Sequence, residues 1–220
     1  KVFRAPPAQP IKTQTMSPPW IALGVSALVL FVGFLAQLGV FTWPTVSVED
    51  VKPKQIIYKY YTGGMKKVGP AFKALSALIG KICDHNARMV GVYYDDPEKT
   101  PEDKTRWAVG VMEEDLDASA KECLLKAGYK TFLLQGCKTV EAKWKFIPQL
   151  GFLSILLMVH RCYPALEKYI KTNKLHSGNA MEFYHGYKKN SFGIGFIPVD
   201  VRFALKDRNT WAVPEVLASK

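Results

Sequence analysis

No aspartate or glutamate precedes Glu49 in this 220-residue chain. The stretch before it starts with lysine rather than methionine and holds basic residues among several prolines. A segment that is basic and free of acidic residues is typical of a processed organellar import sequence. We therefore expect a basic, Pro-rich arm over residues 1–19. We also expect an organelle membrane location, with the mitochondrial inner membrane preferred over the endoplasmic reticulum.

The chain also lacks closely spaced ligands for a metal or a dense disulfide framework. No two of the four cysteines form a CxxC pair, and the four histidines stand singly. These residues are Cys83, Cys123, Cys137 and Cys162, and His85, His160, His176 and His185. The sequence therefore predicts free thiols, no metal site and no cofactor.

Charge is absent from residues 20–41, WIALGVSALVLFVGFLAQLGVF. At about 1.5 Å per helical residue this run is about 33 Å long, close to the roughly 30 Å of hydrocarbon in a bilayer. Trp20 and Trp43 flank the run, and tryptophan favours the membrane interface. A signal peptide has a shorter apolar region, of about 7–15 residues. We predict a single transmembrane helix over residues 20–43 and a linker over residues 44–54.

Basic residues outnumber acidic ones by 30 to 19, which gives a formal net charge of +11. Such a balance fits nucleic acid, anionic lipid headgroups or an acidic neighbour. For an anchored chain we expect other membrane protein subunits and anionic lipids as partners, and no nucleic acid. The predicted headgroup contacts are Lys52, Lys54, Lys59, Lys66 and Lys67. A solvated basic surface explains any one of these lysines equally well.

Hydrophobic periodicity divides the rest of the chain into two similar units. The first has strand patterns at residues 55–61, 88–95 and 105–112 and a helical pattern at 65–81. The second, after a connecting helix at 116–127, has strands at 130–134 and 138–146, a long helix from residue 149 that Pro164 kinks or divides, and strands at 180–187 and 191–199. Two strand-helix-hairpin units predict an α+β domain over residues 55–205, followed by a C-terminal extension over residues 206–220.

Two segments resemble the GyrI-like domain family: VGVYYDDPEKTPEDKTRWAVG in the first hairpin and YPALEKYIKTNKL in the second long helix. The hairpin residues that carry the resemblance are Tyr93, Tyr94, Asp95, Pro97, Pro101, Trp107 and Gly110. The likeness covers about residues 54–200 and implies a fold shared with SOUL haem-binding proteins. It also implies a groove between the two halves that binds apolar ligands or proteins. Within the family the chain resembles a single-pass membrane protein with a long disordered tail, which the sequence here does not include.

Some family members resemble small hydrolases in which a glutamate of the last strand works with a groove tyrosine. If Pro198 matches the family's proline, Ile194 takes the place of that acid, and isoleucine cannot transfer a proton. Glu182 is the nearest carboxylate, and its alternation with its neighbours predicts an outward-facing strand residue. We therefore expect no catalytic residue and no enzymatic activity. The residues predicted to line a ligand groove are Tyr58, Tyr60, Trp107, Tyr184, Gly193 and Gly195.

An acidic cluster in the first hairpin, DDPEKTPED at residues 95–103, has two interpretations. Its carboxylates could bind a cation, but the prolines and lysines between them favour a solvated turn.

Three functions remain after these steps. The preferred one is a membrane-anchored, non-catalytic interaction or accessory subunit of a larger membrane protein assembly. The resemblance implies an alternative, an adaptor of the endoplasmic reticulum like an autophagy receptor. A second alternative is a GyrI-like protein that binds or hydrolyses a small molecule.

Overall fold

The computed structural model describes residues 19–37, 40–80, 86–191, 193–207 and 209–219. The predicted arm lies outside the described residues apart from Pro19, and so does Cys83. The chain divides into two compact units, residues 1–42 and residues 43–220.

Helix α1 spans Pro19–Gln37. Within the part of the chain that the structure describes, no helix is both long enough and apolar enough to cross a membrane. This finding corrects the predicted transmembrane helix over residues 20–43, since the helix ends at Gln37 and leaves Thr42 and Trp43 outside it. The predicted fold class was wrong in this part, whereas the α+β domain with a large antiparallel sheet is observed.

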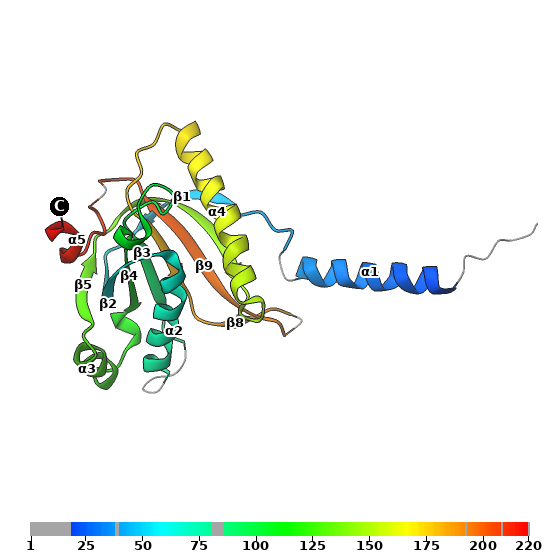
Figure 1. The fold of residues 1–220 in the computed structure, drawn as a ribbon, viewed down its shortest axis with the longest axis horizontal. Coiled ribbons are helices and arrows are strands. Elements are labelled where there is room, and N and C mark those ends of the chain that lie inside the picture. The colour runs from blue at the N-terminus through cyan, green and yellow to red at the C-terminus, as the bar shows by residue number, and fades with distance from the viewer. Residues whose placement is uncertain (1–18, 38–39, 81–85, 192, 208, 220) are drawn as a thin grey trace, which may run out of the picture. The chain divides into compact units, whose positions relative to one another are not determined.

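The domain is built on one large sheet (Figure 1). Its strands are β1 (Val46–Val51), β2 (Lys54–Thr62), β3 (Met89–Tyr93), β4 (Arg106–Met112), β5 (Lys130–Leu134), β6 (Cys137–Phe146), β7 (Ala180–Tyr184), β8 (Lys188–Lys189) and β9 (Gly195–Ala204). The strand order is β1-β6-β9-β7-β3-β4-β2-β5, and β8 pairs with β9. Each of these pairings is antiparallel.

The helices of the domain are α2 (Val68–Ile79), α3 (Ala118–Lys126), α4 (Phe152–Thr172) and α5 (Pro214–Ala218). Short 3₁₀ turns occupy Met65–Lys67, Glu102–Lys104, Glu113–Asp115 and Pro148–Leu150. Helix α2 buries Ala71, Leu75 and Ile79, which recur every four residues and so form one apolar face. Asp117 caps α3 by accepting a hydrogen bond from the backbone N–H of Ala120 at 2.7 Å.

Two halves of the sheet have the same arrangement. In the first half β2, α2, β3 and β4 follow one another, and the strands lie in the order β3-β4-β2. In the second half β6, α4, β7 and β9 follow one another, and the strands lie in the order β7-β9-β6. The halves meet where β3 pairs with β7, which makes this pair the centre of the sheet.

The register decides which side chains share a face, because residues directly opposite each other on paired strands point the same way. One such row across the sheet is Ile57, Val111, Met89, Tyr184, Val199 and Trp144. This row packs against α2 and α3 in the first half and against α4 in the second. We call this side the helix face, and Figure 1 shows α2 and α4 crossing it.

The opposite side, here called the open face, has its own core. Val90, Val92, Met181 and Phe183 lie there and pack with a C-terminal segment, Trp211–Val216. Strands β3 and β7 are therefore covered on both sides. A central strand of this kind cannot be read from alternation as one apolar and one solvated face.

Several elements differ from the prediction in detail, among them β9, which spans Gly195–Ala204 where a strand over 191–199 was predicted. Strand β1 lies in the stretch taken as linker, where it forms the outer strand beside β6. Helix α4 continues through Pro164 as one element, although proline removes one backbone donor from a helix.

Candidate functional site

Glu182 lies at the centre of the helix face, on β7. Its register partners are Gly91 on β3 and Val201 on β9. Only 4% of its surface is exposed. The carboxylate thus lies at the meeting point of the two halves, below the helices that cover them.

Three tyrosine hydroxyls donate hydrogen bonds to the Glu182 carboxylate. Tyr93 donates to Oε2 at 2.7 Å, Tyr184 donates to Oε2 at 2.9 Å, and Tyr163 donates to Oε1 at 2.9 Å. The donors come from β3, β7 and α4, so both halves of the domain contribute. Among the described residues no lysine, arginine or histidine forms an ion pair with Glu182.

Aromatic rings surround this cluster. The Tyr184 ring meets the edges of Phe72 and Phe146, with centroid distances of 5.1 and 6.4 Å. The absence of a side chain at Gly91 makes room, because a Cβ there would lie 2.9 Å from the Tyr93 hydroxyl and 3.1 Å from the Phe72 ring. The three tyrosines keep part of their surfaces exposed while Glu182 beneath them is buried. The site is therefore a buried carboxylate beneath a partly exposed cluster of aromatic rings.

Burial raises the pKa of Glu182 above its ordinary value, although hydrogen bonds from the three tyrosines oppose the rise. Burial also raises the pKa of Tyr93, Tyr163 and Tyr184 well above the usual range, and the nearby carboxylate adds to the rise. The tyrosines consequently remain protonated donors at physiological pH. They provide hydrogen bonds but no positive charge to the carboxylate.

The raised pKa of Glu182 predicts how stability depends on pH. The contribution of Glu182 to the free energy of unfolding is fully present below the ordinary glutamate pKa. It is lost as the pH rises through the higher folded-state pKa. We expect Glu182→Gln to match the wild type in unfolding free energy near pH 4 and to exceed it at pH 8. The difference in unfolding free energy between the two proteins grows by up to about 1.4 kcal/mol for each pH unit between the ordinary and the folded-state pKa. Urea unfolding at several pH values measures this difference.

The exposed Glu122→Gln provides the control for that series, because Glu122 pairs with Lys126 on the surface of α3. It is expected to follow the wild type at every pH. A Glu182→Gln protein that is less stable than the wild type at pH 8 would contradict the proposed cost of burying this charge.

The residues predicted to line a groove do not meet in one place. Tyr184 belongs to the Glu182 cluster, whereas Trp107 is fully buried, stacks on Tyr61 and donates to the Gly63 carbonyl at 2.8 Å. Tyr58 and Tyr60 lie on the open face, where the Tyr58 hydroxyl donates to Glu215 at 2.8 Å.

The two glycines of that prediction lie at and before the start of β9. Gly195 lies against the Tyr187 ring, and Gly193 has a φ of 77° in the turn before it. They lie outside the Glu182 cluster.

The five lysines predicted to contact lipid lie on different elements. Lys54 pairs with Glu114 at 2.8 Å, and the Lys59 ammonium lies 5.6 Å from the centroid of the Tyr129 ring. Lys52 follows β1, and Lys66 and Lys67 lie in the 3₁₀ turn before α2.

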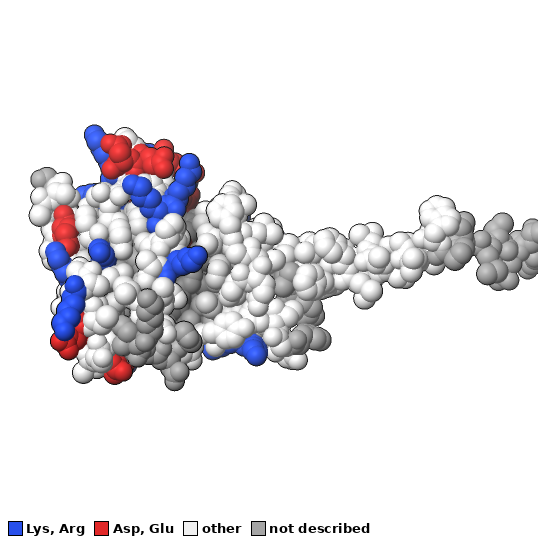
Figure 2. Space-filling model, turned by 60° about the horizontal axis from the view of Figure 1, so that its bottom comes forward, with Lys and Arg blue, Asp and Glu red and all other residues white. Residues whose placement is uncertain are grey.

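The acidic cluster of the first hairpin is used within the protein. Asp95 accepts hydrogen bonds from the Arg106 side chain at 2.7 and 2.8 Å, and Asp96 pairs with Lys99 at 2.5 Å. The hydrogen bond from Arg106 lowers the pKa of Asp95 below its ordinary value, although burial opposes this. Figure 2 shows acidic and basic side chains side by side at the upper end of the domain and further charged side chains along its left edge.

The sequence interpretation missed the role of Glu182, which is buried and not outward-facing. Its tyrosine partners lie 89, 19 and 2 positions away in the chain, so no local spacing connects them. The one available signal was the resemblance, because the matching hairpin and helix contain Tyr93 and Tyr163.

Comparison with known proteins gives two relatives in sequence. No family model matches the chain. It is 30% identical over 158 residues to the Testis-expressed protein 264 homolog of Mus musculus, covering 69% of this chain and 49% of the relative. It is 29% identical over 163 residues to Testis-expressed protein 264 of Homo sapiens, covering 71% and 50%. The chain is homologous to these proteins and spans about half of their length.

Solved structures give neighbours in fold only. The crystal structure of the EcmrR C-terminal domain has a TM-score of 0.49 at 10% identity and covers 74% of this chain and 98% of that one. EcmrR in a DNA complex has a TM-score of 0.49 at 8% identity, covering 84% and 67%. A putative bacterial transcription regulation protein from Staphylococcus aureus has a TM-score of 0.45 at 10% identity, covering 73% and 97%.

These comparisons correct the predicted partners. The exclusion of nucleic acid was wrong as stated, because a structural neighbour is solved in complex with DNA. Membrane protein subunits and anionic lipids find no support, nor does the single-pass membrane part of the resemblance. At 8% identity the neighbour shows similarity of fold alone and assigns no DNA binding to this chain. What the comparisons establish is homology to Testis-expressed protein 264 over about 70% of the chain.

Proposed function

We propose that this chain contains a non-catalytic binding domain that holds an organic cation against the aromatic cluster over Glu182. The observation that carries the proposal is the buried Glu182 carboxylate with three neutral tyrosine donors and no cationic side chain as an ion-pair partner among the described residues. The ligand would provide the positive charge that no described side chain places beside the Glu182 carboxylate.

An ionised carboxylate away from water costs several kcal/mol unless a charge compensates it. Hydrogen bonds from tyrosines offset part of this cost but leave the net charge in place. The rings of Tyr184 and Phe72 add negative π faces, which also attract a cation. A cation with an apolar body would therefore gain from the carboxylate and the rings together.

The same groups support binding over catalysis. The tyrosines hold their protons too tightly to act as bases near pH 7, because burial raises each pKa. Burial also raises the pKa of the adjacent Cys162 to about 12, so this thiol is a poor nucleophile. The site thus has one acidic group and no activated nucleophile beside it among the described residues.

Titration of the full chain with tetraphenylphosphonium, followed by calorimetry, tests the proposal. We expect saturable binding that strengthens as the pH rises and Glu182 loses its proton. Glu182→Gln is expected to weaken binding at least about tenfold, because it removes the charge and keeps the shape. Tyr184→Phe should have a smaller effect, since two tyrosine donors remain.

Two controls make the result specific. Glu122→Gln removes a surface charge and should leave binding unchanged. Triphenylphosphine oxide, a neutral molecule of similar shape, should bind more weakly than the cation. Equal affinity of the wild type and Glu182→Gln for the cation would overturn the proposal. Roles as an accessory subunit of a larger assembly, or as an adaptor of the endoplasmic reticulum, stay predictions.

A further inference from the structure

The open face of the sheet contains a cavity of about 600 Å³ on the side opposite to Glu182. Met181, Phe183 and Trp211 provide apolar lining. The charged side chains come from β6, β8 and β9, from the residue before β3, and from the segment around β1 and the start of β2. Small-molecule sites commonly have volumes of about 300–1,000 Å³ and mix apolar surface with a few polar groups. The size and lining of the cavity fit a ligand of moderate size.

Arg202 is held rigidly in this cavity. Its Nε donates to the Glu141 carboxylate, and its Nη2 donates to Asp200 Oδ2 at 2.8 Å. The guanidinium also lies over the Phe183 ring, 5.4 Å from its centroid. Nη1 has no hydrogen-bond partner among the described residues, although both other nitrogens do.

The two buried carboxylates of the cavity are already compensated. Glu141 has Arg202 and, at 3.6 Å, Lys143. Asp200 has Arg202 and His185, whose Nε2 lies 2.7 Å from Oδ2. These acids consequently offer little to a cationic ligand.

Positive charge at the cavity remains available. Six lysines or arginines line it, together with four aspartates or glutamates. Two of these cations, Lys54 and Arg88, already pair with Glu114 and Asp115 outside the lining, so the available charge comes from the others. Lys188 on β8 is exposed and forms no ion pair within the described residues, and Lys143 keeps 68% of its side chain exposed. Glu49 and Asp50 also line the cavity, on the β1 side.

We propose that this cavity binds an amphipathic organic anion. The apolar body of the ligand lies against Met181 and Phe183, and its carboxylate, sulfonate or phosphate group lies near Lys143, Lys188 and the free Nη1 of Arg202. Binding here is independent of the Glu182 site, because the two sites are on opposite faces of the sheet. The cation and the anion therefore have separate sites on one domain.

Calorimetric titration of the full chain with 1-naphthalenesulfonate tests the inference, with neutral 1-naphthalenemethanol as the matched probe. We expect the sulfonate to bind more tightly than the alcohol. Lys188→Glu should weaken sulfonate binding at least about fivefold, and Lys143→Gln should weaken it by a smaller factor. Neither change should alter binding of tetraphenylphosphonium.

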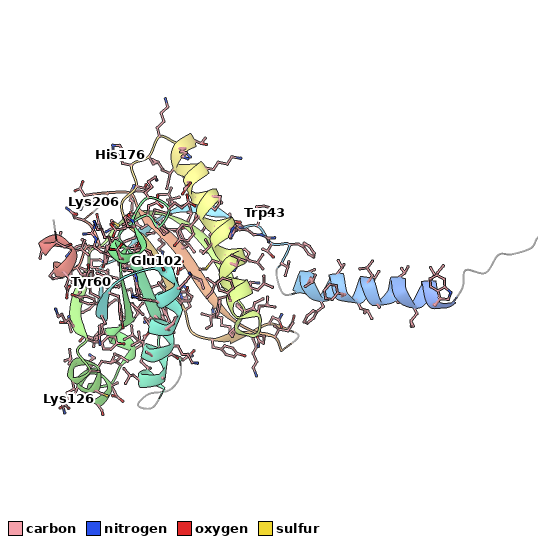
Figure 3. The ribbon with its side chains drawn as sticks, viewed as in Figure 1. Trp43, Tyr60, Glu102, Lys126, His176 and Lys206 are labelled. Atoms are coloured by element: carbon pink, nitrogen blue, oxygen red, sulfur yellow. The ribbon has the colours of Figure 1, made fainter. Side chains whose placement is uncertain are left out.

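Lys126→Glu is the control, because it makes the same charge change on α3, at the lower end of the domain in Figure 3 and outside the cavity lining. It should leave sulfonate affinity unchanged, as should Glu182→Gln. Equal affinity for the sulfonate and the alcohol would overturn the inference. It would also be overturned if Lys188→Glu, shown to be folded by its urea transition, bound like the wild type, or if Glu182→Gln abolished sulfonate binding.

Discussion

Replacing Arg202 by methionine is expected to lower the free energy of unfolding by about 3–5 kcal/mol, the range found when one partner of a buried ion pair is removed. Methionine keeps much of the apolar volume but leaves Glu141 and Asp200 without their shared donor. Glu141 has only 2% of its side chain exposed, so water cannot replace the lost contact. Urea unfolding at pH 7 measures the loss.

The pH dependence of the stability loss distinguishes a broken ion pair from a packing defect. Burial acts to raise the pKa of Asp200, but the hydrogen bond with His185 and the Arg202 charge lower it below the ordinary value. The wild type therefore keeps the contribution of Asp200 above the ordinary aspartate pKa, of about 3.9, and loses it as the pH falls through the lower folded-state value. In Arg202→Met the Asp200 carboxylate takes up a proton more readily, so the loss should shrink near pH 4.

Two further variants provide stability losses with which the loss in Arg202→Met can be compared. Lys143→Met removes the exposed partner of Glu141, 3.6 Å away, and should cost less than about 1 kcal/mol. Adding Glu141→Gln and Asp200→Asn to Arg202→Met should recover part of the lost stability. A loss below about 1 kcal/mol for Arg202→Met, or one that does not change with pH, would contradict the assignment.

Trp211→Ala is expected to cost about 3–5 kcal/mol, as other buried tryptophan deletions do. The side chain is fully buried in the open-face core, and its Nε1 donates to the Gln135 carbonyl at 3.1 Å. Its removal leaves a large cavity between the C-terminal segment and the sheet. A shift of the urea midpoint with an unchanged slope would show that the whole domain is destabilised.

The neighbouring Leu217→Ala is the control for this experiment, because Leu217 is 49% exposed on α5 and should cost little. Trp211→Phe should lie between the two, since the ring is smaller and the donor is lost. If Trp211→Ala unfolds at the wild-type midpoint, the C-terminal segment contributes no stability to the domain.

Most strands and helices of the domain could be predicted because their patterns are local. The apolar face of α2 recurs every four residues, and β4 alternates large and small side chains, so each pattern shows within one segment. Strand β1 was missed because an outer strand with Glu49 and Asp50 has no apolar run to mark it. Its pairing depends on β6, which lies about 90 residues away in the chain.

The candidate site could not be predicted in the same way. Alternation shows that Glu182 points away from Met181 and Phe183, but it does not say which side is covered. Because helices cover one side of β7 and the C-terminal segment packs on the other, the outward position proved to be buried. The apolar run 20–41 was a second case, in which composition suggested a longer helix than α1.

The alternating strand β7 has a consequence for insertions and deletions. Phe183 pairs with Asp200 on the open face, and Glu182 pairs with Val201 on the helix face. A slip of one residue against β9 would turn Glu182 toward Asp200 and Arg202 and turn Phe183 toward the helices. One residue lost inside β7 itself would thus exchange the surroundings of both proposed ligands at once. Length changes in the loop between α4 and β7 should be tolerated far better, because the loop absorbs them before Ala180.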